Sequence, residues 1–193
     1  MRVVGGRLKG RVLSAPASRA IRPTSERLRE SIFDILVHRY AGRLEGTRAV
    51  DLFAGSGALG IEALSRGARF ALFVDNGTEA RALLRANVEA LGLGGVSRIW
   101  RADATRLGKA PAGGPFGLAF LDPPYGQDLA TRALVSLVEG GWLEPDALCV
   151  VEEAAKAAIL APKGLALVDE RTYADTRVAF FRRDGANALP DQG

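Results

Sequence analysis

The stretch AVDLFAGSGALGIEAL, residues 49–64, decides the fold that we predict for this chain. A short apolar run ends in a loop that holds Gly55, Gly57 and Gly60, and residues at helical spacing follow it. Glycine at these positions permits a tight turn and lets a ligand approach the backbone closely. The start of the following helix offers unpaired N–H groups. The stretch therefore predicts a strand, a ligand-binding loop and a helix.

On both sides of this stretch, apolar runs alternate with helical segments. This alternation predicts an α/β fold of the Rossmann-like kind, with a seven-stranded, mostly parallel sheet covered on both faces. The last two runs follow each other without a helix, which predicts an antiparallel C-terminal hairpin at one sheet edge. The predicted strands are 49–53, 70–74, 96–100, 116–121, 148–151, 166–169 and 178–181, and the predicted helices are 25–40, 58–66, 77–91 and 128–140.

The charge of the chain is concentrated at one end. The 193 residues are 48% apolar and carry a net charge of +4, as expected of one globular domain. Residues 1–48 hold eleven Arg or Lys and four Asp or Glu, which makes +7, whereas the remainder is −3. A polyanion should therefore approach the N-terminal quarter. The residues expected to grip nucleic-acid phosphates are Arg7, Lys9, Arg11, Arg19 and Arg22.

Three segments are expected: a basic extension over 1–46, a catalytic domain over 47–183 and a tail over 184–193. The single cysteine, Cys149, excludes an internal disulfide and a cysteine-based zinc site, so no metal is expected. No apolar run is long enough to span a bilayer, and residues 1–11 lack the apolar core of a secretory signal. These features predict a cytoplasmic protein without a membrane partner.

Three aspartates follow three successive predicted strands. Asp51 precedes the glycine loop, Asp75 ends the second strand and Asp103 follows the third. A carboxylate at Asp51 would repel a pyrophosphate but suits a ligand with a cationic amino group. Asp75 suits ribose hydroxyls, and Asp103 suits an adenine amine. The spacing favours one nucleoside with an amino-acid tail, such as S-adenosylmethionine, over a dinucleotide.

The sequence Asp122-Pro123-Pro124-Tyr125 comes at the end of the fourth predicted strand. The two prolines fix the backbone and remove two N–H donors, so the carbonyl between them points in one direction. A carboxylate, a fixed carbonyl and an aromatic face can bind a planar amino group and stack on its ring. Glu152 and Glu153 close the fifth strand and are expected to be solvated, with one of them lining the pocket as the alternative.

These motifs together carry a family resemblance. DLFAGSGALGIEALSRGA (51–68) followed by LDPPYG (121–126) resembles class I S-adenosylmethionine-dependent amino-methyltransferases. RPTSERLRESIFDIL (22–36) narrows the resemblance to the RsmD family of bacterial 16S rRNA guanine-N2 methyltransferases. One departure is the aspartate at position 75, where glutamate is more usual. The resemblance implies cofactor contacts from Asp51, Gly55, Ser56, Gly57, Asp75, Asp103 and Ala104, and a guanine amine held by Asp122, Pro123 and Tyr125.

The resemblance implies methylation of a guanine N2 amine in 16S rRNA or the small ribosomal subunit, by a monomer that does not act on DNA. Two alternatives remain open at this stage. A DNA or other RNA amino-methyltransferase would use the same motifs, although 193 residues leave little room for a DNA target-recognition domain. A non-catalytic rRNA-binding assembly factor would keep the fold without the activity. Asp51 also disfavours a nicotinamide-dependent dehydrogenase.

Overall fold

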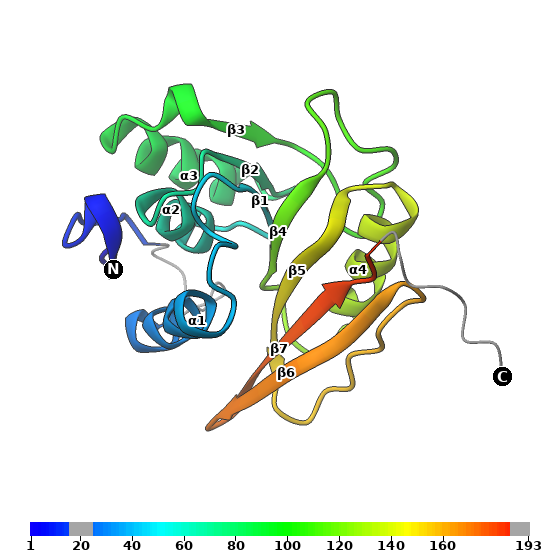
Figure 1. Ribbon diagram of the computed structural model, residues 1–193. Coiled ribbons are helices and arrows are strands. Elements are labelled where there is room, and N and C mark those ends of the chain that lie inside the picture. The colour runs from blue at the N-terminus through cyan, green and yellow to red at the C-terminus, as the bar shows by residue number, and fades with distance from the viewer. Residues whose placement is uncertain (16–24, 186–193) are drawn as a thin grey trace, which may run out of the picture.

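Seven strands form one sheet in the order β3-β2-β1-β4-β5-β7-β6 in the computed structural model, which describes residues 1–15 and 25–185 (Figure 1). Strands β1 to β5 pair in parallel, and β7 lies antiparallel between β5 and β6. The mostly parallel sheet and the C-terminal hairpin are thus confirmed. The strands are β1 (Arg48–Leu52), β2 (Phe70–Val74), β3 (Ser97–Trp100), β4 (Phe116–Leu121), β5 (Leu143–Ala154), β6 (Leu165–Tyr173) and β7 (Thr176–Arg183).

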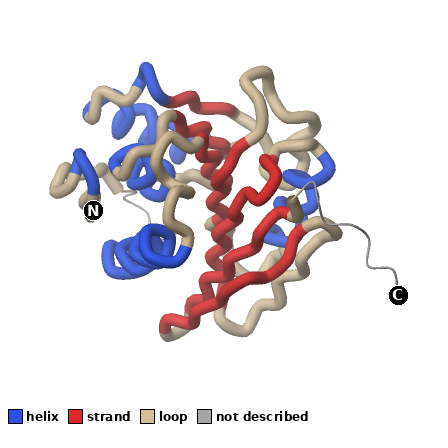
Figure 2. Tube along the Cα trace, in the orientation of Figure 1, coloured by secondary structure: helices blue, strands red, loops and turns tan. Residues whose placement is uncertain are grey.

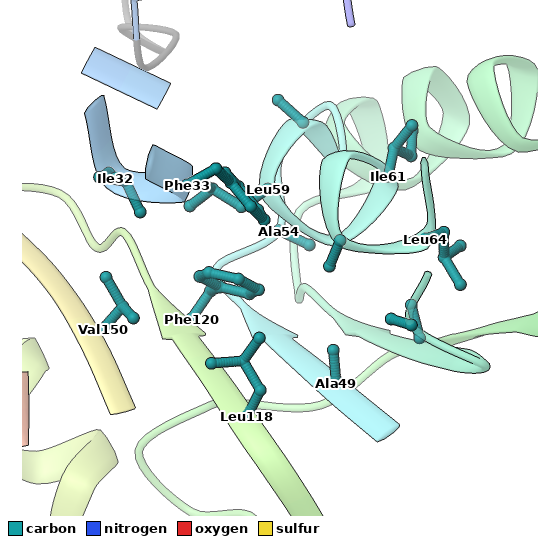
Figure 3. Close-up of a cluster of buried hydrophobic side chains, with 14 of the residues drawn as sticks. Ile32, Phe33, Ala49, Ala54, Leu59, Ile61, Leu64, Leu118, Phe120 and Val150 are labelled. Carbon is teal, nitrogen blue, oxygen red and sulfur yellow. The ribbon is translucent and has the colours of Figure 1, made fainter. Parts of the chain in front are cut away.

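Helices cover both faces of the sheet (Figure 2). The α-helices are α1 (Glu26–Arg39), α2 (Ala58–Ser65), α3 (Thr78–Ala90) and α4 (Leu129–Glu139), with short 3-10 turns at Gly6–Leu8 and Gly94–Val96. One apolar cluster joins α1, α2 and α3 to one face, and a second joins α4 to the other. Figure 3 shows Ile32 and Phe33 of α1 close to Phe120 of β4.

Helix α1 begins where the sequence predicted. The Ser25 side chain accepts a hydrogen bond from the Leu28 N–H at 3.1 Å and caps the helix, and Glu26 favours the positive end of its dipole. The apolar positions then bury against the sheet, and Phe33 and Leu36 are both 0% exposed. The cap and the buried apolar positions account for the close match between this helix and the predicted range 25–40.

The N-terminal residues dock along α2. Val3, Leu8 and Leu13 belong to the same apolar cluster as α1 and α2. The Val4 N–H donates to Glu62 at 2.9 Å, and the Leu8 N–H donates to the Ser65 hydroxyl at 2.9 Å. Residues 1–15 therefore share an apolar core with the helices on this face of the sheet.

A buried ion cluster supports this docking. Glu62 is 0% exposed and lies between two arginines, 3.5 Å from Arg29 and 2.8 Å from Arg66. Burial lowers the pKa of Arg29, and the Glu62 charge opposes that effect. The Arg29 guanidinium also donates to the Arg2 carbonyl. Removing Glu62 alone would leave buried cations, so this cluster fixes α1, α2 and the extension relative to one another.

Five strands differ from their predicted bounds, and β5 and β6 differ the most. β5 was predicted over 148–151 but runs from Leu143 to Ala154, and β6 extends to Tyr173. Many of the added residues are polar, so apolar patterning does not reveal them. Pairing with β7 makes residues 152–154 of β5 and the additions to β6 strand, whereas Leu143 pairs with Phe116 of β4. β1 ends at Leu52 instead of Phe53, because Phe53 adopts a left-handed conformation with φ of 58°.

Candidate active site

A cavity of about 570 Å³ lies at the carboxyl ends of β1, β2 and β4. The chain leaves β1 and β4 toward opposite ends of the sheet, and open α/β sheets bind ligands at such a point. The volume is in the range of cofactor sites. The predicted site residues that line it are Asp51, Gly55, Ser56, Asp75, Ala104, Asp122, Pro123 and Tyr125.

The glycine loop is shaped by two close approaches. A Cβ on Gly57, whose φ is 81°, would lie 2.3 Å from Leu84 of α3. A Cβ on Gly60 would lie 2.4 Å from the Phe73 ring and 3.1 Å from the Asp51 carboxylate. Side chains at either position would push α2 or α3 away from the sheet. These two glycines therefore serve packing.

Asp75 holds the glycine loop through its carboxylate. One oxygen accepts from the Gly55 N–H at 2.9 Å, and the other accepts from the Gly77 N–H at 2.7 Å. A carboxylate has about four acceptor positions, so each oxygen retains capacity for a further donor such as a ribose hydroxyl. Asp75 thus joins the ends of β1 and β2 and faces the cavity.

Asp51 is a buried carboxyl in the wall of the same cavity. It is 2% exposed and accepts a hydrogen bond from the Gly60 N–H at 2.9 Å. Burial raises its pKa to about 8, and the nearby Asp75 charge adds to the increase. A cationic ligand group would compensate this buried charge, which supports the predicted role of Asp51.

The Tyr125 ring is fixed through its hydroxyl. The hydroxyl donates to Glu152 of β5 at 2.7 Å and lies 3.2 Å from the Thr176 hydroxyl at the start of β7. Burial raises the pKa of Tyr125, so the hydroxyl keeps its proton. Two strands therefore set the orientation of the aromatic face.

The expectation that Glu152 and Glu153 are solvated is wrong. They are 6% and 2% exposed. Glu153 accepts from the Gly126 N–H at 3.1 Å and from the Ala154 N–H at 2.8 Å. These glutamates hold the segment after Pro124 from the neighbouring strand. Position at the end of a predicted strand was the signal that could have found them.

Asp103 lies at the edge of the site. It is exposed, and one of its oxygens accepts from both the N–H and the hydroxyl of Thr105, which lowers the pKa of Asp103. The adjacent Ala102 and Ala104 line the cavity. The adenine contact predicted for Asp103 stays a prediction.

The basic residues of the extension lie away from the cavity. Arg7 and Lys9 are exposed and flank Leu8, whose N–H is held by Ser65 at the end of α2. The Arg11 guanidinium donates to the carbonyl of Ala90, the last residue of α3, at 3.2 Å. The cavity lies at the other end of these helices, about 12 Å away along α2. Arg19 and Arg22 fall outside the described residues.

Other kinds of site are not seen in the part of the chain that the structure describes. Within 1–15 and 25–185, no three His, Cys, Asp or Glu side chains gather as they would around a metal ion. No helix among those residues has the length and apolar character to cross a membrane.

Comparison with known proteins places the chain in a family. The sequence model of the family described as "Conserved hypothetical protein 95" matches residues 1–182. Ribosomal RNA small subunit methyltransferase D of Escherichia coli is 36% identical over 152 residues, which cover 79% of this chain and 74% of that protein. The Haemophilus influenzae protein of the same name is 32% identical and covers 89% and 88%. The chain is a member of the RsmD family.

A solved structure agrees with this membership. The yhhF protein of Escherichia coli superimposes with a TM-score of 0.81 at 30% identity, covering 96% of this chain and 98% of that one. As an RsmD-family methyltransferase, the protein uses S-adenosylmethionine as its methyl donor. The cavity fits this cofactor, because the buried Asp51 suits its cationic amine and Asp75 has acceptor capacity for ribose hydroxyls.

The first prediction concerns the pH dependence of cofactor binding. With a pKa of about 8, Asp51 is mostly protonated at pH 7 in the free protein, and an amine pairs only with the ionised carboxylate. Binding then releases a proton, so affinity should rise by up to about tenfold per pH unit below about pH 8 and fall again above it, where the amine of the ligand loses its own proton. Calorimetry across this range measures the slope.

The control for this titration is Asp51→Asn, which cannot ionise. It should bind S-adenosylmethionine weakly and with a flatter pH profile. A wild-type slope in this variant would assign the pH dependence to the ligand and contradict the role of Asp51.

The second prediction concerns Asp75→Ala. The change removes the acceptors of Gly55 and Gly77 and those available to the ribose, so we expect a loss of about 1.5–3 kcal/mol in S-adenosylmethionine binding, the scale of hydrogen bonds to a charged group. The Michaelis constant for the cofactor measures it, and Asp75→Asn should lose less. An unchanged constant in Asp75→Ala would show that the ribose is held elsewhere.

Proposed function

We propose that this protein methylates the exocyclic N2 amine of a guanine in 16S rRNA on the small ribosomal subunit. The observation that carries the proposal is the place of Asp122-Pro123-Pro124-Tyr125 in the wall of the cavity that also contains Asp51 and Asp75. Amine-binding groups and cofactor-binding groups thus share one enclosed space. The relatives named ribosomal RNA small subunit methyltransferase D support rRNA as the substrate.

S-adenosylmethionine, when bound, supplies an electrophilic methyl group on a positively charged sulfur. The Asp122 carboxylate and the Pro123 carbonyl accept the two hydrogens of the amine. This orients the nitrogen lone pair out of the plane of the base and stabilises the positive charge that develops on nitrogen. Tyr125, held by Glu152, provides a fixed surface for the base. Holding the two reacting groups in line supplies the remaining acceleration.

The target base must leave its stack to reach this cavity. The exposed Arg7 and Lys9 lie about one length of α2 away from the cavity, so they would hold RNA backbone at a distance from the extruded guanine. In this arrangement the extension provides affinity for the RNA backbone, and the cavity recognises the target base.

The third prediction tests the chemistry with Asp122→Ala. This variant should lose at least about a hundredfold in turnover, because the acceptor for the amine is gone. Its affinity for S-adenosylmethionine should stay within a few-fold, since Asp51 and Asp75 remain. Transfer of a labelled methyl group to small subunits from cells lacking the enzyme, followed by nucleoside analysis, measures turnover and should yield N2-methylguanosine in the wild type.

Each other product of the same assay identifies another function. A methylated adenine would replace the guanine proposal with another amino-methyltransferase activity. Absence of any product, with normal cofactor binding, would favour an rRNA-binding assembly factor. Loss of cofactor affinity in Asp122→Ala equal to that of Asp75→Ala would contradict the separate roles of these two residues.

The fourth prediction tests the extension with Arg7, Lys9 and Arg11 changed together to Ala. Phosphate contacts release counterions, so the slope of log affinity for rRNA against log salt should flatten by about two to three units if all three make contacts. Cofactor binding should stay within a few-fold, because Arg7 and Lys9 lie away from the cavity and Arg11 contributes one hydrogen bond, to the Ala90 carbonyl. Lys163→Ala serves as the control, because Lys163 is exposed on the segment that packs against α4. An unchanged slope would contradict the role of the extension and would instead assign the RNA contact to the loop that contains Arg106 and Lys109.

A further inference from the structure

Helix α3 touches both the cofactor cavity and the N-terminal extension. Its first turn lines the cavity with Thr78 and Ala80. In its middle, Leu84 packs at the Gly57 backbone. At its end, the Ala90 carbonyl receives the Arg11 guanidinium. One rigid element therefore contacts the part of the protein that binds the methyl donor and the part to which we assign RNA backbone contacts.

Asn87, one turn before the end of α3, connects these two parts directly. Its side-chain N–H groups donate to the Ser56 carbonyl at 2.9 Å and to the Ser14 carbonyl at 3.1 Å. Its side-chain oxygen accepts from the Ser14 N–H at 2.8 Å. Ser56 belongs to the glycine loop and lines the cavity, whereas Ser14 belongs to the extension.

The geometry of this amide permits one arrangement only. Both hydrogens of the Asn87 amide face carbonyl oxygens, and the amide oxygen faces an N–H. If the amide were rotated by 180°, its oxygen would face the two carbonyl oxygens and none of these hydrogen bonds could form. Asn87 is 2% exposed, so water does not readily replace a lost partner. A shift of either Ser56 or Ser14 therefore breaks hydrogen bonds in a buried place. The positions of the two segments are linked in free energy.

We propose that Asn87 is a positioning residue that couples occupancy of the cofactor cavity to the hold of the extension on RNA. A ligand that contacts the glycine loop fixes Ser56, which holds the Asn87 amide and with it Ser14. When the cofactor is bound, the extension is already ordered, so RNA binding loses less free energy in ordering it. Because coupling between two binding sites is reciprocal, bound RNA increases the affinity for the cofactor by the same factor. The effect on RNA affinity rests on the proposed function. The effect of a bound cofactor on the order of the extension does not depend on the proposed function.

The first experiment needs no RNA. The Leu13 N–H donates to the Met1 carbonyl within the extension and makes no bond to Asn87. Saturating S-adenosylhomocysteine, the demethylated form of the cofactor, should slow hydrogen exchange of the Leu13 amide several-fold in the wild type. In Asn87→Ala, at equally saturating ligand, this slowing should disappear.

A matched control loosens the extension at another place. Ser65→Ala removes the hydroxyl that accepts from the Leu8 N–H and donates to the Gly5 carbonyl at 2.5 Å, and leaves Asn87 intact. Its extension should exchange faster overall, yet S-adenosylhomocysteine should still slow Leu13. Asn87→Leu is a second test if Asn87→Ala does not fold, because its side chain fills a similar volume and has neither an acceptor for the Ser14 N–H nor a hydrogen for the two carbonyls.

The second experiment measures rRNA affinity with and without S-adenosylhomocysteine. The wild type should bind at least about fivefold tighter with it, and Asn87→Ala should show a ratio near one. Slowing of Leu13 that survives in Asn87→Ala, absence of slowing in the wild type, or equal wild-type RNA affinities would each overturn the proposal. Failure of the proposed function is read separately, from the methylated nucleoside, and leaves the exchange result standing.

Discussion

The reversal of the chain from β1 into α2 is the constraint on which the rest of the structure depends. Within a few residues, the backbone passes so close to Phe73 and Leu84 that Gly57 and Gly60 cannot carry a side chain. The close packing leaves the backbone N–H groups of Gly55 and Gly60 facing Asp75 and Asp51. The same turn thus places two carboxyls in one cavity wall.

Burial gives these two carboxyls different properties. Asp75 shares its charge between two backbone N–H groups at the surface of the cavity. Burial of Asp51 raises its pKa to about 8, and the single hydrogen bond that it accepts from the Gly60 N–H opposes this increase only in part. An enclosed carboxyl costs free energy when ionised, and a cation that enters the cavity recovers it. The site therefore favours a ligand that combines hydroxyl groups with a positive charge.

The amine-binding side of the cavity depends on the C-terminal half of the sheet. Tyr125 follows β4, but its hydroxyl is held by Glu152 of β5 and faces Thr176 of β7. The antiparallel insertion of β7 between β5 and β6 brings Thr176 to this edge. The hairpin thus orients the aromatic surface on which the base is proposed to rest. On the opposite side, α3 and Asn87 give the N-terminal extension a direct contact with the glycine loop.

Patterns of neighbouring residues were enough to predict the sheet, its hairpin, the capped α1 and the two motifs that line the cavity. These depend on local physics: apolar spacing, a Ser25 cap, glycines in a turn and prolines that fix a backbone. The sequence could not show that Arg7 and Lys9 lie at the far end of α2. Nor could it pair Asn87 with Ser14, 73 residues away in the chain. Such contacts join segments far apart in sequence, and only packing against the sheet decides which polar groups lose water and must find a partner.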